Sequence, residues 1–241
     1  PYKKDNLNEE ELKQVEYCKD IILNNRLFMT PREILNDPLE GMAVPIGLGI
    51  SGAGIYASLG MLHPFVEEKI NQYRILSLSA NARSPLMWAH YADYHRGICI
   101  KYHFPNSLTS LYSEPGTSVK YFRDVQYKDD LSVLTEKDSI TIEDAFFAKS
   151  KAWKYENELR LILCDPNSSG LYDSIDIPNC IEAIYFGVNC AKKDIKVIRE
   201  IMKNREFVTK QESIETRTPV SFYQMEFDSK KFGSLIAKKL Q

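Results

Sequence analysis

Hydrophobic and polar positions follow two periods along this chain, one typical of helices and one typical of strands. Residues 9–25 carry an apolar stripe at helical spacing and end at an Asn pair, which predicts a surface helix. The segments ELRLILC (158–164) and EAIYFGV (182–188) are the two clearest strand patterns. A helical pattern over residues 191–204 follows the second strand, so helices and strands are mixed within one sequence.

The remaining patterns extend this mixture. Further strands are expected at residues 74–79, 98–104, 119–127 and 218–228, and further helices at 64–72, 85–95, 141–153 and in the lysine-rich C-terminal segment. Thr30 and Pro31 open a short helix that an Asn-Asp-Pro turn closes. Because hairpin signals are weak and neither a linker nor a repeat interrupts the pattern, we expect a single α+β domain over residues 1–241. Its fold would be a central mixed, mostly antiparallel sheet flanked by helices.

Glycine is concentrated in one segment. Six of the 11 glycines fall between residues 41 and 60, and this density predicts a loop or flap of low order that approaches the functional cleft. Within it, GLGISG at residues 47–52 has the spacing of a phosphate-binding G-x-G-x-x-G loop. No convincing strand precedes the motif and no helix follows it, so a flexible loop is favoured.

Composition narrows the class of protein. With 44% hydrophobic residues, 27% charged residues and a net charge of −2, the chain has no polybasic segment that would indicate nucleic acid. The apolar stretch at residues 43–62 is interrupted by five glycines and a proline, so we expect no membrane span. Five cysteines at irregular spacing, with no C-x-x-C pair, favour reduced thiols in the cytoplasm over disulfides or structural zinc.

The segment SPLMWAHYADYHRGICIKY gathers aromatic rings that carry polar groups. On a helix, Trp88, Tyr91 and His95 share one stripe. His90 and His95 lie roughly 140° apart around the axis, so no metal site is expected there. Two interpretations stay open: a helix that buries its aromatic residues in the core, or the wall of a cleft that stacks a planar ligand.

The segment WKYENELRLILC contains a second candidate site. Strand alternation places Glu156, Glu158 and Arg160 on one face, opposite the leucines. Charged groups followed by apolar residues suggest that the strand enters a cleft. The low dielectric there would strengthen the electrostatic effect of these groups on a ligand. The alternative is an ion pair that faces solvent. Ser77 and Ser79, on one face of the strand expected before the aromatic helix, are suited to orient a carboxylate.

Several ordered motifs carry a resemblance to a known bacterial family. They are Tyr2-Lys3, Leu27-Phe28, Asn36-Asp37-Pro38-Leu39-Glu40, Ser77-Leu78-Ser79, Met87-Trp88-Ala89-His90-Tyr91-Ala92, His95-Arg96-Gly97-Ile98-Cys99-Ile100, Trp153-x-Tyr155-Glu156-x-Glu158-x-Arg160 and Ile184-Tyr185-Phe186-Gly187. This set resembles the domain of unknown function 2971 family. The family label brings no established activity, so the resemblance by itself predicts no function.

A more distant likeness concerns mechanism. The order of a first strand with an aromatic residue, a middle strand with Ser-x-Ser and a late strand with Glu-x-Glu resembles the ADP-ribosyltransferase fold, whose late glutamate acts on NAD. The likeness implies that Glu158 is the catalytic carboxylate and Glu156 its companion. It further implies that Ser77 and Ser79 form the orienting strand and that Tyr2 is the first-strand residue.

The chemistry of NAD cleavage is consistent with these residues. Breaking the nicotinamide–ribose bond passes through an oxocarbenium-like state, which a fixed carboxylate stabilises. An aromatic platform would bind the nicotinamide ring, and a cation would bind the pyrophosphate. The residues expected to line this NAD site, besides the two serines, are Trp88, His90, Tyr91, His95, Tyr155, Arg83 and Arg160.

The expected function is therefore that of an NAD-dependent, ADP-ribosyltransferase-like toxin or antiviral effector, whose acceptor is a protein or a nucleic acid. One alternative is a non-catalytic module that senses a nucleotide in the same cleft. Another is a metal-dependent nuclease or hydrolase that uses Glu156, Glu158 and His90, which is disfavoured because these residues lack recognisable ligand spacing. We expect a cytoplasmic location and no membrane partner.

Overall fold

The computed structural model describes residues 19–38, 40, 68, 70–104, 118–129, 145–164, 173–211 and 214–241. Contacts divide the chain into unit 1, made of Pro1–Phe28, Ala82–Ser107 and Ser174–Gln241, and unit 2, made of Met29–Asn81 and Leu108–Asp173. Tyr2 and the flap expected at residues 41–60 lie outside the described residues. The single-domain expectation stays a prediction.

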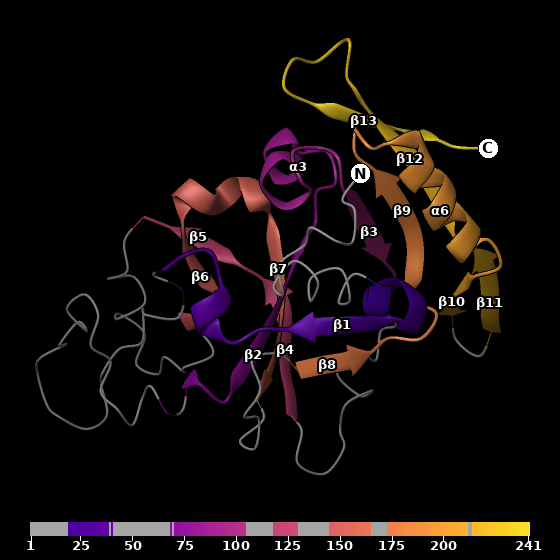
Figure 1. Ribbon diagram of the computed structural model, residues 1–241. Coiled ribbons are helices and arrows are strands. Elements are labelled where there is room, and N and C mark those ends of the chain that lie inside the picture. The colour runs from indigo at the N-terminus through magenta and orange to yellow at the C-terminus, as the bar shows by residue number, and fades with distance from the viewer. Residues whose placement is uncertain are drawn as a thin grey trace, which may run out of the picture. The chain divides into compact units, whose positions relative to one another are not determined.

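Unit 2 is built on the strand pattern ELRLILC, which forms β7 (Glu158–Cys164) (Figure 1). β2 (Tyr73–Ser79) and β4 (Ser118–Asp124) pair antiparallel with its two sides, in the order β2-β7-β4. In β7, every residue except Leu159 is buried. In β2, the last three residues are not buried. The apolar core around these strands contains Ile70, Tyr73, Ile75, Phe146, Phe147, Ile162 and Cys164.

The prediction of a helix at residues 141–153 is wrong for most of the residues in this range that the structure describes. Ala148–Ser150 forms strand β6, which pairs in parallel with β5 (Gln126–Lys128). Lys151–Glu156 then forms the 3-10 helix η3, and Asn157 ends it in a left-handed conformation with φ of 45°. Non-local strand pairing has overridden the local helical pattern, which is a weak preference.

Unit 1 contains a four-stranded sheet that grows from the strand pattern EAIYFGV. Its order is β13 (Leu235–Lys239), β12 (Ser221–Phe227), β9 (Ile181–Phe186) and β3 (Ile98–Tyr102). β12 runs parallel to β9, and the two other pairings are antiparallel. The sheet therefore joins the middle of the sequence to its C-terminal end.

Two helices pack against this sheet through residues that alternate along β9. Ile184 belongs to the apolar cluster that includes residues of α6 (Lys192–Met202). Its neighbour Tyr185 packs instead against the cluster that contains Trp88 of α3 (Pro85–Tyr91). Because successive strand residues point to opposite faces, α6 and α3 contact opposite faces of the sheet.

The helix expected at residues 85–95 ends at Tyr91. Residues 93–95 have φ angles of 45°, 51° and 67°, a left-handed run that a right-handed helix cannot include. The backbone of His95 is held on both sides, since its amide donates to the Trp88 carbonyl at 3.1 Å and its carbonyl accepts from the Asn189 amide at 2.9 Å.

The helix expected at the C-terminus is also wrong, because this segment is strand β13. The chain reverses between β12 and β13, where the Asp228 amide donates to the Ser234 carbonyl at 3.0 Å and Gly233 has φ of 74°. The other described elements are β1 (Arg26–Met29), β8 (Asp173–Asp176), η2 (Arg32–Ile34), and the hairpin of β10 (Glu206–Gln211) and β11 (Ile214–Pro219).

The α+β class is confirmed, and the sheet arrangement is more divided than expected. The described strands form five separate sheets, mostly antiparallel, in place of one central sheet. The strands that the sequence pattern missed, such as the hairpin of β10 and β11, account for part of this difference. The ADP-ribosyltransferase likeness of the fold stays a prediction.

Gly187→Ala is expected to destabilise the protein. A Cβ at Gly187 would lie 2.1 Å from the His95 carbonyl oxygen and 2.6 Å from its carbon, so the backbone would have to move. Overpacking of this kind costs about 1–3 kcal/mol. Urea unfolding measures the loss, with Gly233→Ala as the comparison because its Cβ meets nothing within 4 Å and only its φ is unfavourable. A Gly187→Ala variant as stable as wild type would contradict this close approach.

Candidate functional site

Strand register brings the two sequence-predicted polar pairs of unit 2 together. Ser77 lies opposite Arg160, and Ser79 lies opposite Glu158, across the antiparallel ladder of β2 and β7. Residues directly opposite one another project to the same face of a sheet. The hydroxyls and the charged groups therefore share one face.

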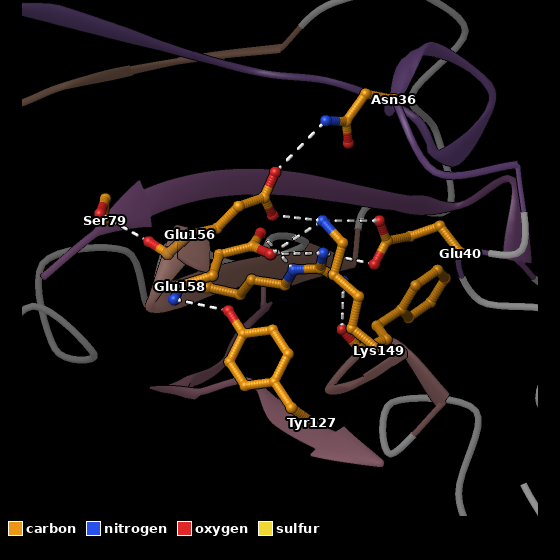
Figure 2. A network of polar contacts seen from close by, with 9 residues as sticks. Asn36, Glu40, Ser79, Tyr127, Lys149, Glu156 and Glu158 are labelled. Carbon is orange, nitrogen blue, oxygen red and sulfur yellow. Dashed lines mark hydrogen bonds and ion pairs between the residues drawn. The ribbon is translucent and has the colours of Figure 1, made fainter. Parts of the chain in front are cut away.

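Five charged side chains converge beside this pairing and form what we call the buried ionic cluster: Glu40, Lys149, Glu156, Glu158 and Arg160 (Figure 2). Their side chains are between 0% and 5% exposed. Charged groups are this deeply buried only when they are paired, so each member depends on the others. Three carboxylates against two cations leave a formal excess of one negative charge.

Arg160 forms the most directional contacts of the cluster. Its Nε donates to Glu158 Oε1 at 2.6 Å and its Nη2 donates to Glu158 Oε2 at 2.9 Å, a two-pronged pairing that fixes the plane of the carboxylate. Nη1 donates to the carbonyl of Phe146, and Nη2 also forms an ion pair with Glu40. The guanidinium is thus held by an acidic residue of β7, a second acidic residue and the backbone.

Lys149 of β6 lies among all three carboxylates. Its Nζ is 2.6 Å from Glu156 Oε2, 3.3 Å from Glu158 Oε2 and 3.6 Å from Glu40 Oε2. Figure 2 shows Glu156 and Glu40 approaching the ammonium from opposite sides. The same Nζ lies 4.8 Å from the centre of the Trp153 ring, within the range of a cation–π contact.

Neutral groups complete the surroundings of the two glutamates. Asn36 Nδ2 donates to Glu156 Oε1 at 3.4 Å, and Ser79 Oγ donates to the Glu156 carbonyl at 2.6 Å. The Glu158 amide donates to the Tyr127 hydroxyl oxygen at 2.9 Å, while Ser77 hydrogen-bonds the Glu158 carboxylate. Both serines are exposed, so the surface of unit 2 lies beside the buried ionic cluster on their side.

The carboxylates respond differently to the same burial. Burial alone would raise the pKa of Glu158, but the hydrogen bond and charge of Arg160, with Lys149 and Ser77, hold it below its ordinary value. For Glu40, burial outweighs the attraction of the two cations and raises the pKa. Burial would lower the pKa of Lys149, yet the surrounding carboxylates raise it, so this amine stays charged.

The aromatic helix α3 belongs to unit 1, while the ionic cluster belongs to unit 2. Trp88 is 2% exposed, packs among the core residues of unit 1, and donates from Nε1 to the Ala82 carbonyl at 2.8 Å. His90 and Tyr91 are exposed, and His95 is half-buried with its ring 6.4 Å from that of Phe227. Packing thus accounts for Trp88, whereas the roles of the other three rings stay predictions.

Two members of the cluster escaped the sequence analysis. Lys149 fell within a segment interpreted as a helix, so its place on a strand beside Glu156 was not visible. Glu40 was part of a family-like motif, but nothing in its spacing pointed to Arg160. Tyr155, which had been assigned to the NAD site, is half-buried on η3, and its ring lies 6.2 Å from that of Trp153.

Within the described segments, no group of three or more His, Cys, Asp or Glu side chains is arranged to hold a metal ion. In the buried ionic cluster, the ammonium of Lys149 occupies the place between the carboxylates. No helix among the described residues is both long and apolar enough to cross a bilayer.

Arg160→Met is expected to be strongly destabilising. The substitution keeps a long apolar stem but leaves Glu40 and Glu158 buried with one cation between them, and breaking a buried ion pair on one side typically costs about 3–5 kcal/mol. Arg217→Met is the matched control, because Arg217 is 62% exposed in its pairing with Glu215 and an exposed pair contributes less than about 1 kcal/mol. Chemical denaturation of both variants measures the difference. Equal losses would contradict the importance of the cluster.

Glu158→Gln and Glu40→Gln should have opposite pH dependence. Because the folded pKa of Glu158 is lowered, its ionised form stabilises the fold above the unfolded pKa of about 4.3, and this contribution is lost as pH falls through the folded pKa. Glu158→Gln therefore costs more at neutral pH than in acid. The raised pKa of Glu40 means that its ionisation opposes folding. The stability of Glu40→Gln relative to wild type should therefore increase as pH rises through that pKa. Unfolding curves across this range test both signs, and parallel pH profiles would refute them.

Comparison with known proteins adds one relationship. Residues 87–161 match a family described as "Protein of unknown function (DUF2971)". The matched segment begins in α3 and ends in β7, so it contains Lys149, Glu156, Glu158 and Arg160 of the ionic cluster. No curated protein and no solved structure matches the chain. This match confirms the expected resemblance to that family over residues 87–161.

Proposed function

We propose that the protein is an ADP-ribosyltransferase-like enzyme that cleaves the nicotinamide–ribose bond of NAD and transfers ADP-ribose to an acceptor. The observation that carries this proposal is the pairing of β2 with β7, which places the exposed Ser77 in hydrogen-bond contact with the Glu158 carboxylate. This is the juxtaposition that the Ser-x-Ser and Glu-x-Glu order implies.

Glu158 has the charge that the reaction requires. When the N-glycosidic bond breaks, its electron pair leaves with nicotinamide and positive charge develops at the anomeric carbon of the ribose. Arg160 and Lys149 keep the pKa of Glu158 low, so its carboxylate is ionised at neutral pH and can stabilise this charge. An acceptor oxygen or nitrogen then forms the new bond at the same carbon and loses its proton.

Exposure indicates the side from which NAD would approach. Arg160 is fully buried behind Glu158, while Ser77 and Ser79 are exposed at the end of β2. A ribose hydroxyl that replaces Ser77 as a hydrogen-bond donor would come next to the carboxylate. Tyr155 and Trp153 add partly exposed rings on η3, suitable for contact with a planar group.

A second candidate is a nucleotide-binding module without catalysis. The observation in its favour is that Glu158 is already contacted by both prongs of Arg160, by Lys149 and by Ser77. A carboxylate offers about four acceptor positions, so these contacts would fill them, as expected of a structural group. The two candidates differ in whether NAD is consumed.

Glu158→Gln is expected to reduce nicotinamide release from NAD by a factor of about a hundred to a thousand, because the amide keeps the volume but cannot stabilise the developing positive charge. Ser77→Ala should cause a smaller loss, about tenfold, since a single hydrogen bond to a charged group is removed. The assay follows nicotinamide release and ADP-ribose transfer to candidate protein and nucleic-acid acceptors.

Glu226→Gln serves as the matched control, because Glu226 lies in unit 1 and forms an exposed pair with Lys238. Melting temperatures measured on the same samples separate loss of catalysis from loss of fold. Equal turnover by wild type and Glu158→Gln would refute the transferase proposal. A thermal shift with NAD or ADP-ribose, without any turnover, would favour the binding module.

A further inference from the structure

We infer that Lys149 is a positioning residue, which holds the carboxylates of Glu156 and Glu158 in one fixed arrangement for reaction with the substrate. This inference rests on the proposed function and assigns a role to a residue that the sequence motifs do not include. Lys149 would not touch NAD, because its side chain is only 2% exposed. It would act through the two glutamates.

The contacts of Lys149 differ from those of Arg160 in the groups that they join. Arg160 contacts Glu158 and Glu40, whereas Lys149 contacts both of these and also Glu156. Glu156 ends η3 and Glu158 begins β7, on either side of the left-handed Asn157. The ammonium thus connects the two carboxylates across the point where the chain changes direction.

The backbone of β6 makes this connection rigid. Lys149 lies opposite Tyr127 in the parallel pairing of β6 with β5. The Tyr127 hydroxyl accepts the amide hydrogen of Glu158 at 2.9 Å, while Lys149 Nζ lies 3.3 Å from the Glu158 carboxylate. One pair of strand residues therefore holds Glu158 at both its backbone and its side chain.

Electrostatics gives Lys149 a second effect on the same groups. Buried carboxylates close to one another repel, and each would otherwise take up a proton at a higher pH. The titratable and charged groups around the ammonium are Glu40, Glu156, Glu158, Arg160, Tyr127 and Tyr155. Loss of the lysine charge should therefore raise the pKa of Glu158, and activity that needs ionised Glu158 should require a higher pH.

The experiment compares wild type, Lys149→Met, Lys149→Arg and a control, Lys151→Met, whose side chain is 56% exposed in wild type. For nicotinamide release from NAD, Lys149→Met should lower kcat by about ten- to a hundredfold with little change in KM, because misplacement of a reacting group costs about that much. The acid limb of its pH–rate profile should move to higher pH. Lys149→Arg should restore the acid limb and much of kcat, and Lys151→Met should behave as wild type.

A Lys149→Met profile of unchanged shape, with activity lost only in proportion to the folded fraction, would overturn the inference and make Lys149 purely structural. The same conclusion would follow if Lys149→Arg gave no rescue. If Lys149→Met does not fold, Lys149→Gln, which removes the charge but keeps a hydrogen-bond donor, takes its place in the comparison.

A measurement without NAD separates this inference from the proposed function. Carbon NMR of isotopically labelled glutamate side chains follows the titration of Glu158 in wild type and in the Lys149 variants. An upward shift of its pKa in Lys149→Met, reversed in Lys149→Arg, supports the role of Lys149 even if wild type releases no nicotinamide, an outcome that would end the transferase proposal alone. An unmoved titration would overturn the Lys149 inference while leaving the transferase proposal standing.

Discussion

Mutual neutralisation of buried charges is the constraint on which unit 2 depends. Moving one ion out of water costs several kcal/mol even after the protein relaxes, and a whole domain is stable by only about 5–15 kcal/mol. Five such groups can share an interior only if every partner arrives at bonding distance. This pairing requires three features at once: the register of β2 on β7, the short turn of η3 and the pairing of β6 with β5. A shift in any of them would leave a buried charge unpaired.

The same constraint determines where the cluster meets solvent. The first four residues of β2 are buried, three of them as apolar core residues, while Ser77 and Ser79 are exposed. The strand thus passes from an apolar environment to the surface within its own length, beside the first residues of β7. A polar group with one side in the interior and one side at the surface is suited to meet a ligand while its counter-ions stay away from water.

The sequence pattern was most informative for strands whose own residues carry a clear strand signal. ELRLILC and EAIYFGV were identified correctly, since both are short, apolar and β-rich. The association of Ser77 and Ser79 with Glu158 was implied only by the resemblance to the ADP-ribosyltransferase fold. Lys149 could not be placed, because a parallel pairing of β5 with β6 is non-local and leaves no periodic signal.

The C-terminal lysines were misread for a related reason: β13 lies at the edge of its sheet, where lysines are common on a strand. Glu40 has partners more than a hundred positions away, so its role depends on tertiary structure alone.

The distribution of the cluster along the chain has a consequence for the order of folding. Lys149 and Glu158 are nine positions apart, whereas Asn36 and Glu156 are separated by 120 positions. Closing a short loop loses less chain entropy than closing a long one, so contacts within residues 149–160 should form early and those to residues 36–40 late. Until the N-terminal segment docks, the nascent cluster holds two cations and two carboxylates and is electrically balanced. The last carboxylate, Glu40, joins a site that no longer needs its charge, and its docking therefore relies on the packing and hydrogen bonds of the segment that carries it.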